Sequence, residues 1–211
     1  MSVMARVRSL SESLHQKVLD EPGIATRLAM DREACDFERT SYLATWEDSG
    51  GRNAARRAQA LDRGRILADR LEKEHAEVWT ALGVGRADVD VALEIGRAGL
   101  GLGWALAGAA AGLFTDAGVA VGDDVGYGPP RIFSWTETAS IADAVLKQPV
   151  ADFAARYERG ASAWSEWTGE RADATSDPFE SFAAVVAARV ALARYLKAAR
   201  TAGRALLVWA D

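Results

Sequence analysis

The segment Asp124-Val-Gly-Tyr-Gly-Pro-Pro-Arg131 restricts the backbone more than any other part of this chain. Gly126 and Gly128 permit positive φ angles, whereas the two prolines fix φ and donate no backbone hydrogen bond. Such a turn holds Tyr127 and Arg131 in defined directions, as a binding loop would. The same residues also describe a structural turn that ends a strand and resists edge pairing, and this is the interpretation that we favour from the sequence.

As a binding site, the turn would use three side chains. Tyr127 would stack on a ligand or donate a hydrogen bond, Asp124 would orient the ligand, and Arg131 would bind an anion. We therefore treat these residues as candidate ligand-binding residues.

The composition argues against several classes of function. The 211 residues carry a formal net charge of −5, which gives no overall attraction to nucleic acid or to an anionic membrane. The single Cys35 cannot form a disulfide within the chain, so we expect a reducing, cytoplasmic environment. Residues 98–114 carry no charge, but Asp116 follows them closely, so we expect a buried helix rather than a membrane-spanning one.

Helix and strand patterns follow one another along the chain. We expect short strands at residues 3–7, 89–93, 119–121, 131–133 and 205–209. Capping boxes at Ser9 and Ser134, each followed three residues later by Glu, predict helix starts. We expect Trp164, Trp167 and residues 169–177 to form a link, after which Asp177 starts the last long helix. This order predicts an α+β fold, mostly helical around a small sheet, in a single domain.

Residues 31–85 form a highly charged helical segment within this domain. Small or apolar residues recur three and four positions apart along one stripe, at Leu61, Gly64, Ala68, Leu71, His75, Val78 and Leu82. This seam at residues 61–82 predicts one long helix closed by Gly83 that packs on its own domain. The alternative is a homodimer in which the seam pairs with a second copy.

No set of catalytic or metal-binding residues stands out in the sequence. His15 and His75 lack a second histidine or a cysteine at metal-ligand spacing, so we predict no metal and no cofactor. The spacing from Gly99 to Gly103 is G-x-G-x-G, which does not match a dinucleotide-binding loop. A cluster of arginines is expected to be a solvated, salt-bridged face rather than a phosphate site: Arg52, Arg56, Arg57, Arg63 and Arg65.

Two motifs in the second half of the chain carry a resemblance. The first is Asp124-x-Gly-Tyr-Gly-Pro-x-Arg131 followed by a capped helix. The second is the closing run Tyr195-Leu-Lys-Ala-Ala-Arg-x-x-Gly-Arg-Ala-Leu-Leu-Val-Trp209. On these motifs residues 90–211 resemble the YfbM-like family, small bacterial proteins of unassigned function, and residues 1–30 resemble it more weakly. The resemblance implies that residues 31–85 are an insertion into a single YfbM-like domain.

The resemblance also draws attention to the helix that precedes the turn. Family members carry a Lys, a Trp and a His there, and the matching positions in this chain are Arg97, Gly99 and Gly103. Trp104 is retained, so the resemblance adds Arg97 and Trp104 to the candidate ligand-binding residues. The missing histidine removes a group suited to acid–base catalysis. We expect a bulky neighbour or a ligand to cover the bare glycine surface, and the helix and the turn to face each other.

Three functions are consistent with these patterns. The one that we favour is a non-catalytic module that binds a small ligand or a partner protein. The second is an enzyme that uses Arg97, Asp124, Tyr127 and Arg131 on a small anionic or nucleotide-like substrate. The third is a structural subunit that dimerises through residues 61–82.

Overall fold

The computed structural model describes residues 4–49, 53–168 and 181–210, except for the side chains of Arg32, Trp167 and Thr168. Within these residues the chain is α+β and mostly helical, with a five-stranded antiparallel sheet in the order β2-β1-β5-β4-β3, which confirms the predicted fold class. The chain divides into two compact units. The sheet unit comprises Met1–Ala29 and Ala87–Asp211, and the helical unit comprises Met30–Arg86.

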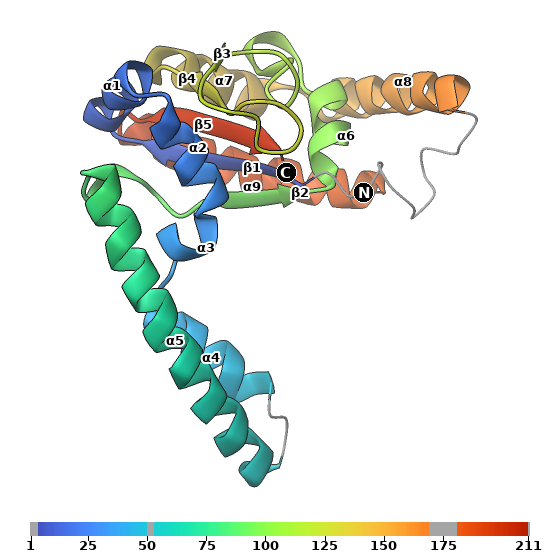
Figure 1. Ribbon diagram of the computed structural model, residues 1–211. Helices are drawn as coiled ribbons and strands as arrows, with labels where there is room; N and C mark the ends of the chain where they lie inside the picture. The colour runs from blue at the N-terminus through green and yellow to red at the C-terminus, as the bar shows by residue number, and fades with distance from the viewer. Residues whose placement is uncertain (1–3, 50–52, 169–180, 211) are drawn as a thin grey trace. The chain divides into compact units, whose positions relative to one another are not determined.

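Figure 1 labels most of the elements of both units. The strands are β1 (Ala5–Leu10), β2 (Leu93–Gly96), β3 (Val119–Ala120), β4 (Arg131–Phe133) and β5 (Ala205–Ala210). The α-helices of the sheet unit are α1 (Glu12–Asp20), α2 (Gly23–Met30, with its last residue in the helical unit), α6 (Ala98–Ala105), α7 (Trp135–Lys147), α8 (Val150–Thr168) and α9 (Phe182–Thr201). Those of the helical unit are α3 (Arg32–Cys35), α4 (Arg39–Ser49) and α5 (Ala54–Leu82).

The core of the sheet unit lies on the face formed by alternate residues of β1 and β5. Val7 pairs with Val208 in the antiparallel ladder, and both side chains point to this face. Helices α6, α7 and α9 cover it with the buried side chains of Leu102, Ile141 and Leu196. Burying a side chain of this size contributes about 1.5–3 kcal/mol to folding. This packing fixes the positions of β4 and of the turn that precedes it.

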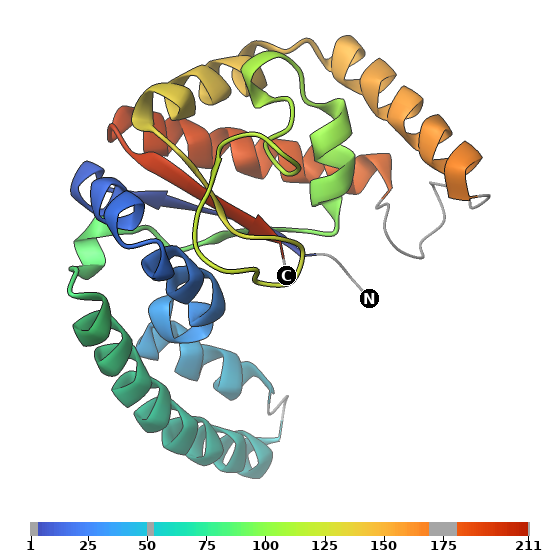
Figure 2. The same cartoon turned by 45° about the horizontal axis from the view of Figure 1, so that its top comes forward.

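The opposite face of the sheet carries the other set of alternate residues. Leu10 and Leu207 belong to this set and are completely buried. Helices α1 and α2 lie in front of the strands and α9 behind them in both Figure 1 and Figure 2. Leu14 of α1 and Leu28 of α2 are buried there, so the sheet has a helical layer on each side.

The predicted capping box at Ser9 is wrong, whereas the one at Ser134 is confirmed. Strand β1 continues to Leu10, and the N-cap of α1 is Ser11, whose Oγ accepts the amide N–H of Leu14 at 3.2 Å. Ser9 is instead buried in the sheet, where its hydroxyl donates to the carboxylate of Asp90. A six-residue ladder with β5 outweighs the local capping pattern, because each ladder residue gains backbone hydrogen bonds and burial.

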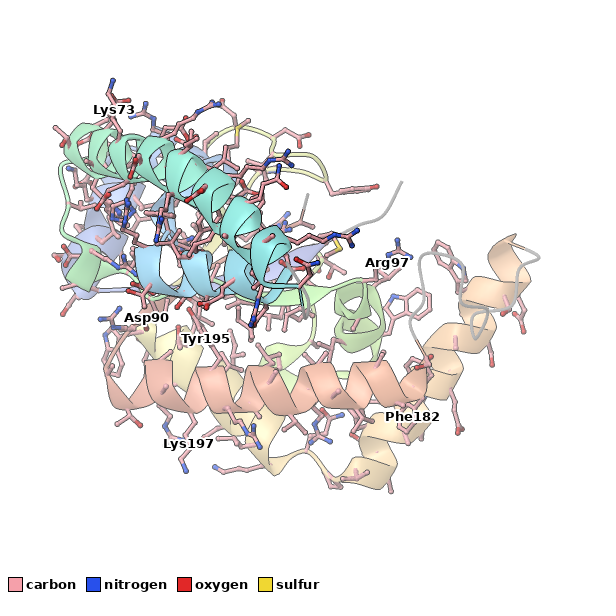
Figure 3. The ribbon with its side chains drawn as sticks, turned by 90° about the horizontal axis from the view of Figure 1, so that it is seen from below. Lys73, Asp90, Arg97, Phe182, Tyr195 and Lys197 are labelled. Atoms are coloured by element: carbon pink, nitrogen blue, oxygen red, sulfur yellow. The ribbon has the colours of Figure 1, made fainter. Side chains whose placement is uncertain are left out.

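Tyr195 and Asp90 tie α9 to the strands, and Figure 3 shows the two residues close together. The hydroxyl of Tyr195 accepts the N–H of Ser9 at 2.7 Å and donates to the carbonyl of Val91 at 3.2 Å. Burial raises the pKa of Tyr195 to about 12. Asp90 forms an ion pair with Arg204 at 3.2 Å, so this group has structural partners on several elements.

The predicted helix over residues 98–114 is shorter in the structure. Helix α6 ends at Ala105, and a short 3₁₀ turn follows at Gly108–Ala110. Gly108 and Gly112 have φ angles of 60° and 79°, which an α-helix does not contain. The uncharged composition therefore reflects burial of a bent segment rather than one continuous helix.

The prediction for residues 164–177 is partly wrong. Residue 164 lies inside α8, which runs to Thr168, and not in a connecting link. The predicted helix start at Asp177 and the polar run from residue 169 lie outside the described residues. From Ser181 onward the prediction agrees with the structure, since Ser181 caps α9 and β5 follows it.

The helical unit spans almost the same residues as the charged segment predicted at 31–85. Its long helix α5 ends at Gly83 in a left-handed conformation, as predicted. Helix α4 packs along the seam: a Cβ built on Gly64 would lie 2.6 Å from the ring of Trp46. Nδ1 of His75 is 2.6 Å from the carbonyl oxygen of Ala34, so the seam histidine bonds within the unit. The seam is therefore occupied by its own chain.

Two properties of the described residues concern membranes and metals. Among the described residues, no helix has both the length and the apolar character needed to span a bilayer. Within the same residues, no three His, Cys, Asp or Glu side chains gather as a metal site would require.

Candidate functional site

The Gly-Pro turn, defined here as residues 124–131, is closed from within by Asp124. One carboxylate oxygen of Asp124 accepts the amide N–H of Gly126 at 2.7 Å and that of Gly128 at 3.0 Å. These two bonds hold the pKa of Asp124 below its usual value of 3.8. Gly126 and Gly128 have φ angles of 139° and 104°, which confirms the predicted positive φ at both glycines. Asp124 thus shapes the turn, and its bonded oxygen points at the turn's own backbone.

Backbone hydrogen bonds anchor the turn to the sheet unit. The N–H of Tyr127 donates to the carbonyl of Ala210 at 3.3 Å, at the end of the central strand β5. The N–H of Val121 donates to the carbonyl of Pro130 at 2.8 Å, and the N–H of Asp123 donates to Oγ1 of Thr26 at 2.8 Å. The turn is therefore held by its partners on both sides.

Arg131 opens β4 and pairs with Val208 of β5. Its Nη1 donates to the carbonyl oxygens of Asp116 at 2.7 Å and Gly118 at 3.3 Å. Both bonds use the same nitrogen, and no ion pair joins Arg131 to an acid of the described residues. Two backbone carbonyl groups thus hold the guanidinium in place.

Tyr127 and Arg131 line one pocket, which we call the turn pocket. Its volume is about 60 Å³, and its walls come from residues 113–115, from residues 127–129 with Arg131, and from residues 208–210 of β5. Tyr127 is 48% exposed, so part of this residue is accessible to a binding partner. Leu113 and Phe114 supply an apolar wall to the same pocket. Among the residues that the structure describes, the lining contains no carboxylate, histidine or cysteine, so these residues offer a cation and a phenol without a general base.

The structure places Arg97 elsewhere. Arg97 follows β2 and lines a different groove together with Glu94, Met4 and the alanines of α9. Figure 3 shows Arg97 beside α6. The turn pocket contains no residue of this groove. Arg97 and Tyr127 therefore do not share either of these two cavities.

Trp104 is also separate from the turn pocket. It packs against α8, where its ring lies 5.9 Å from that of Trp164, measured between centroids. A Cβ built on Gly160 would come within 2.3 Å of the Trp104 ring, so α8 carries a glycine where the indole rests. This contact makes Trp104 a packing residue between α6 and α8.

The glycine surface of α6 is covered by protein. A Cβ on Gly99 would lie 2.2 Å from Cβ of Ala5, and a Cβ on Gly101 would lie 2.8 Å from Val185. Gly103 faces Phe114 and Thr115 at 3.8 and 3.7 Å, which are ordinary contacts. Strand β1 and helix α9 of the same unit therefore cover this surface, and they do so with the small side chains of Ala5 and Val185 rather than with the predicted bulky neighbour. Phe114 and Thr115 lie against α6 and also line the turn pocket, whereas no residue of α6 lines that pocket.

Sequence reasoning missed the apolar wall of the turn pocket. Phe114 is the last residue of the uncharged stretch 98–114, which we predicted to be a buried helix, and Thr115 follows it directly. The glycines at positions 108 and 112 were the signal for a bend there, because both adopt positive φ. Trp209 was assigned to a terminal strand, which is correct, without its position beside the turn.

Comparison with known proteins does not assign the turn pocket to a known kind of site. No family model, no curated protein and no solved structure matched the chain. The resemblance to the YfbM-like family stays a prediction from the sequence.

Proposed function

We propose that this chain is a non-catalytic cytoplasmic binding module, and that the turn pocket receives a carboxylate side chain of a partner protein. The observation that carries the proposal is the pairing of Arg131 with Tyr127 in one small pocket. A guanidinium and a phenol hydroxyl both donate hydrogen bonds, and a carboxylate accepts them.

The size of the pocket favours one group of a large partner over a whole metabolite. Ligand sites usually enclose about 300–1,000 Å³, whereas the turn pocket holds about 60 Å³. A space of this size fits a carboxyl group and its methylene. The rest of the partner would then lie on the surrounding surface, where Tyr127 is half exposed.

The charge of Arg131 supports the same occupant. Its two recorded hydrogen bonds go to carbonyl oxygens through Nη1, which leaves Nε and Nη2 to form a planar pair of donors. A carboxylate matches such a pair with two parallel hydrogen bonds. A phosphate would match the charge as well, but its bulk fits a pocket of this volume less well.

The enzymatic alternative has less support. It needs Arg97, Asp124 and Tyr127 to meet around one substrate. Arg97 lines a different groove, and Asp124 uses one oxygen to accept two N–H groups of its own turn. Neither group is placed to transfer a proton inside the turn pocket.

Selection from a random peptide display library tests the proposal. Peptides enriched on the wild-type chain are expected to share an Asp or Glu, and replacing that acid with its amide should weaken binding by at least about tenfold. Arg131→Gln and Tyr127→Phe should weaken the same peptides, whereas the control variant Arg97→Gln should not. Enriched peptides without a shared acid, or peptides that bind equally after the acid-to-amide change, would contradict the proposal. The peptide substitution leaves the protein intact, so the result does not depend on how a variant folds.

A further inference from the structure

The helical unit contains a groove that sequence reasoning did not identify. Its volume is about 310 Å³, and it lies between the segment 33–45 and Leu71 of α5. Phe37 and Tyr42 give it an aromatic wall, with their ring centroids 5.6 Å apart in an edge-to-face arrangement. We call it the aromatic groove. Figure 1 shows α4 lying along α5 in this unit.

Three acidic residues belong to the lining of the aromatic groove: Glu33, Asp36 and Glu38. Glu38 accepts the amide N–H groups of Thr40 and Ser41 at 3.0 and 2.7 Å, which lowers its pKa to about 2 and keeps it ionised. An apolar wall of aromatic rings with a negative rim suits a guanidinium, which stacks on rings and pairs with carboxylates.

Helix α5 itself carries an exposed arginine, Arg63, two helical turns before the groove residue Leu71. Arg63, Leu67 and Leu71 are four residues apart and therefore lie on one flank of the helix. Arg63 is exposed, and no ion pair joins it to an acid of the residues that the structure describes. Leu67 is 39% exposed, which leaves an apolar side chain between the arginine and the groove. The flank thus presents a cation, an apolar residue and an acidic groove in order.

We propose that two copies of the chain pair through this flank, with Arg63 of each copy in the aromatic groove of the other. An antiparallel arrangement with its two-fold axis at Leu67 places Arg63 of one copy level with Leu71 of its partner, since each lies about 6 Å from the axis along the helix. The two copies of Leu67 then cover each other. Such an interface is isologous, because the same surface serves both copies.

This surface differs from the seam that the sequence suggested for a homodimer. The buried side of the seam is already covered in its own unit, with Gly64 against Trp46 and His75 against Ala34. The proposed contact uses the exposed flank beside it. The proposed contact also involves none of the residues of the turn pocket. The test of the dimer is therefore independent of the test of the proposed function.

Sedimentation equilibrium of the full chain over a range of concentrations tests the inference. The wild type is expected to dimerise, and the dimer should weaken as salt is added, because its charged contacts are screened. Arg63→Glu and Glu33→Arg should each raise the dimer dissociation constant by at least about tenfold. Arg65→Glu is the matched control: it makes the same change two residues away, on the opposite side of α5, and should leave dimerisation unchanged.

Mixing the two variants gives the decisive result. In a heterodimer of Arg63→Glu with Glu33→Arg, one contact is native and the other has its charges exchanged, so association should return. A wild type that stays monomeric at every concentration would overturn the inference. So would a dimer that Arg63→Glu does not weaken, or two weakened variants that fail to associate on mixing while each retains its fold by circular dichroism.

Discussion

Two glycine-rich regions of the sheet unit use glycine for different physical reasons. In α6 the glycines at 99 and 101 permit close packing, because Ala5 and Val185 occupy the space that a side chain would need. In the Gly-Pro turn, Gly128 has open space around it and a φ of 104°. The first region is therefore filled by the protein, and the second holds side chains around an open pocket. Glycine content alone does not distinguish a packed surface from a binding loop.

We expect the largest loss of folding stability for Gly99→Ala. The new methyl group would lie 2.2 Å from Cβ of Ala5, so α6 or β1 must shift. We expect the free energy of unfolding to fall by about 1–3 kcal/mol, as measured by chemical denaturation.

Two matched variants sharpen this prediction. Gly103→Ala meets only contacts of 3.7 Å or more and should stabilise the chain by about 0.5–1 kcal/mol through helix propensity. Adding Ala5→Gly to Gly99→Ala should restore much of the lost stability, because the two methyl groups no longer collide. A neutral Gly99→Ala would remove the packing explanation.

A smaller effect is expected for Gly128→Ala. No atom lies within 4 Å of the added Cβ, so the cost comes from the positive φ alone, at about 1–2 kcal/mol. Gly23→Ala is the control, since it also meets no atom within 4 Å and starts α2 without a positive φ. Equal unfolding free energies for the two variants would show that backbone conformation does not set the need for glycine in the turn.

We expect the smallest effect on stability from protonation of Asp124, whose carboxylate closes the turn. The pKa of Asp124 is lowered in the folded chain, so its contribution is present above the ordinary value of 3.8 and is lost as the pH falls through the lower, folded value. The amide proton signals of Gly126 and Gly128 should therefore move upfield together on acidification below about pH 3.8, as their hydrogen bonds weaken. Asp124→Ala should remove this titration. Signals that titrate identically in the variant would assign the pH dependence to another group.

The sequence predicted the α+β class, the turn and the strands on either side of it, because local rules govern these features. The capping box at Ser134 and the positive φ angles of Gly126 and Gly128 are examples. It failed where long-range contacts decide. Ser9 obeys a capping pattern but pairs in a strand, and Trp104 fits a site pattern but packs on Gly160.

The candidate site could be predicted only in part for the same reason. Tyr127 and Arg131 are seven residues or fewer from Asp124, so one rigid turn brings them together. Arg97 was linked to them through the resemblance, and nothing local tests whether two segments so far apart in sequence converge. The aromatic groove was missed because it combines Phe37, which lies between α3 and α4, with Leu71 of α5, and these residues are far apart in the sequence.

A titration of the chain with acetate shows whether the turn holds Arg131 and Tyr127 in position to bind a carboxylate. Acetate is the side-chain fragment of aspartate, and acetamide at equal ionic strength is its neutral control. We expect saturable shifts of the Arg131 Nε–H and Gly128 amide signals with acetate, in the millimolar range for so small a ligand at about −4 kcal/mol. These shifts should be lost in Arg131→Gln. Shifts of equal size with acetamide, or none with acetate, would contradict this expectation.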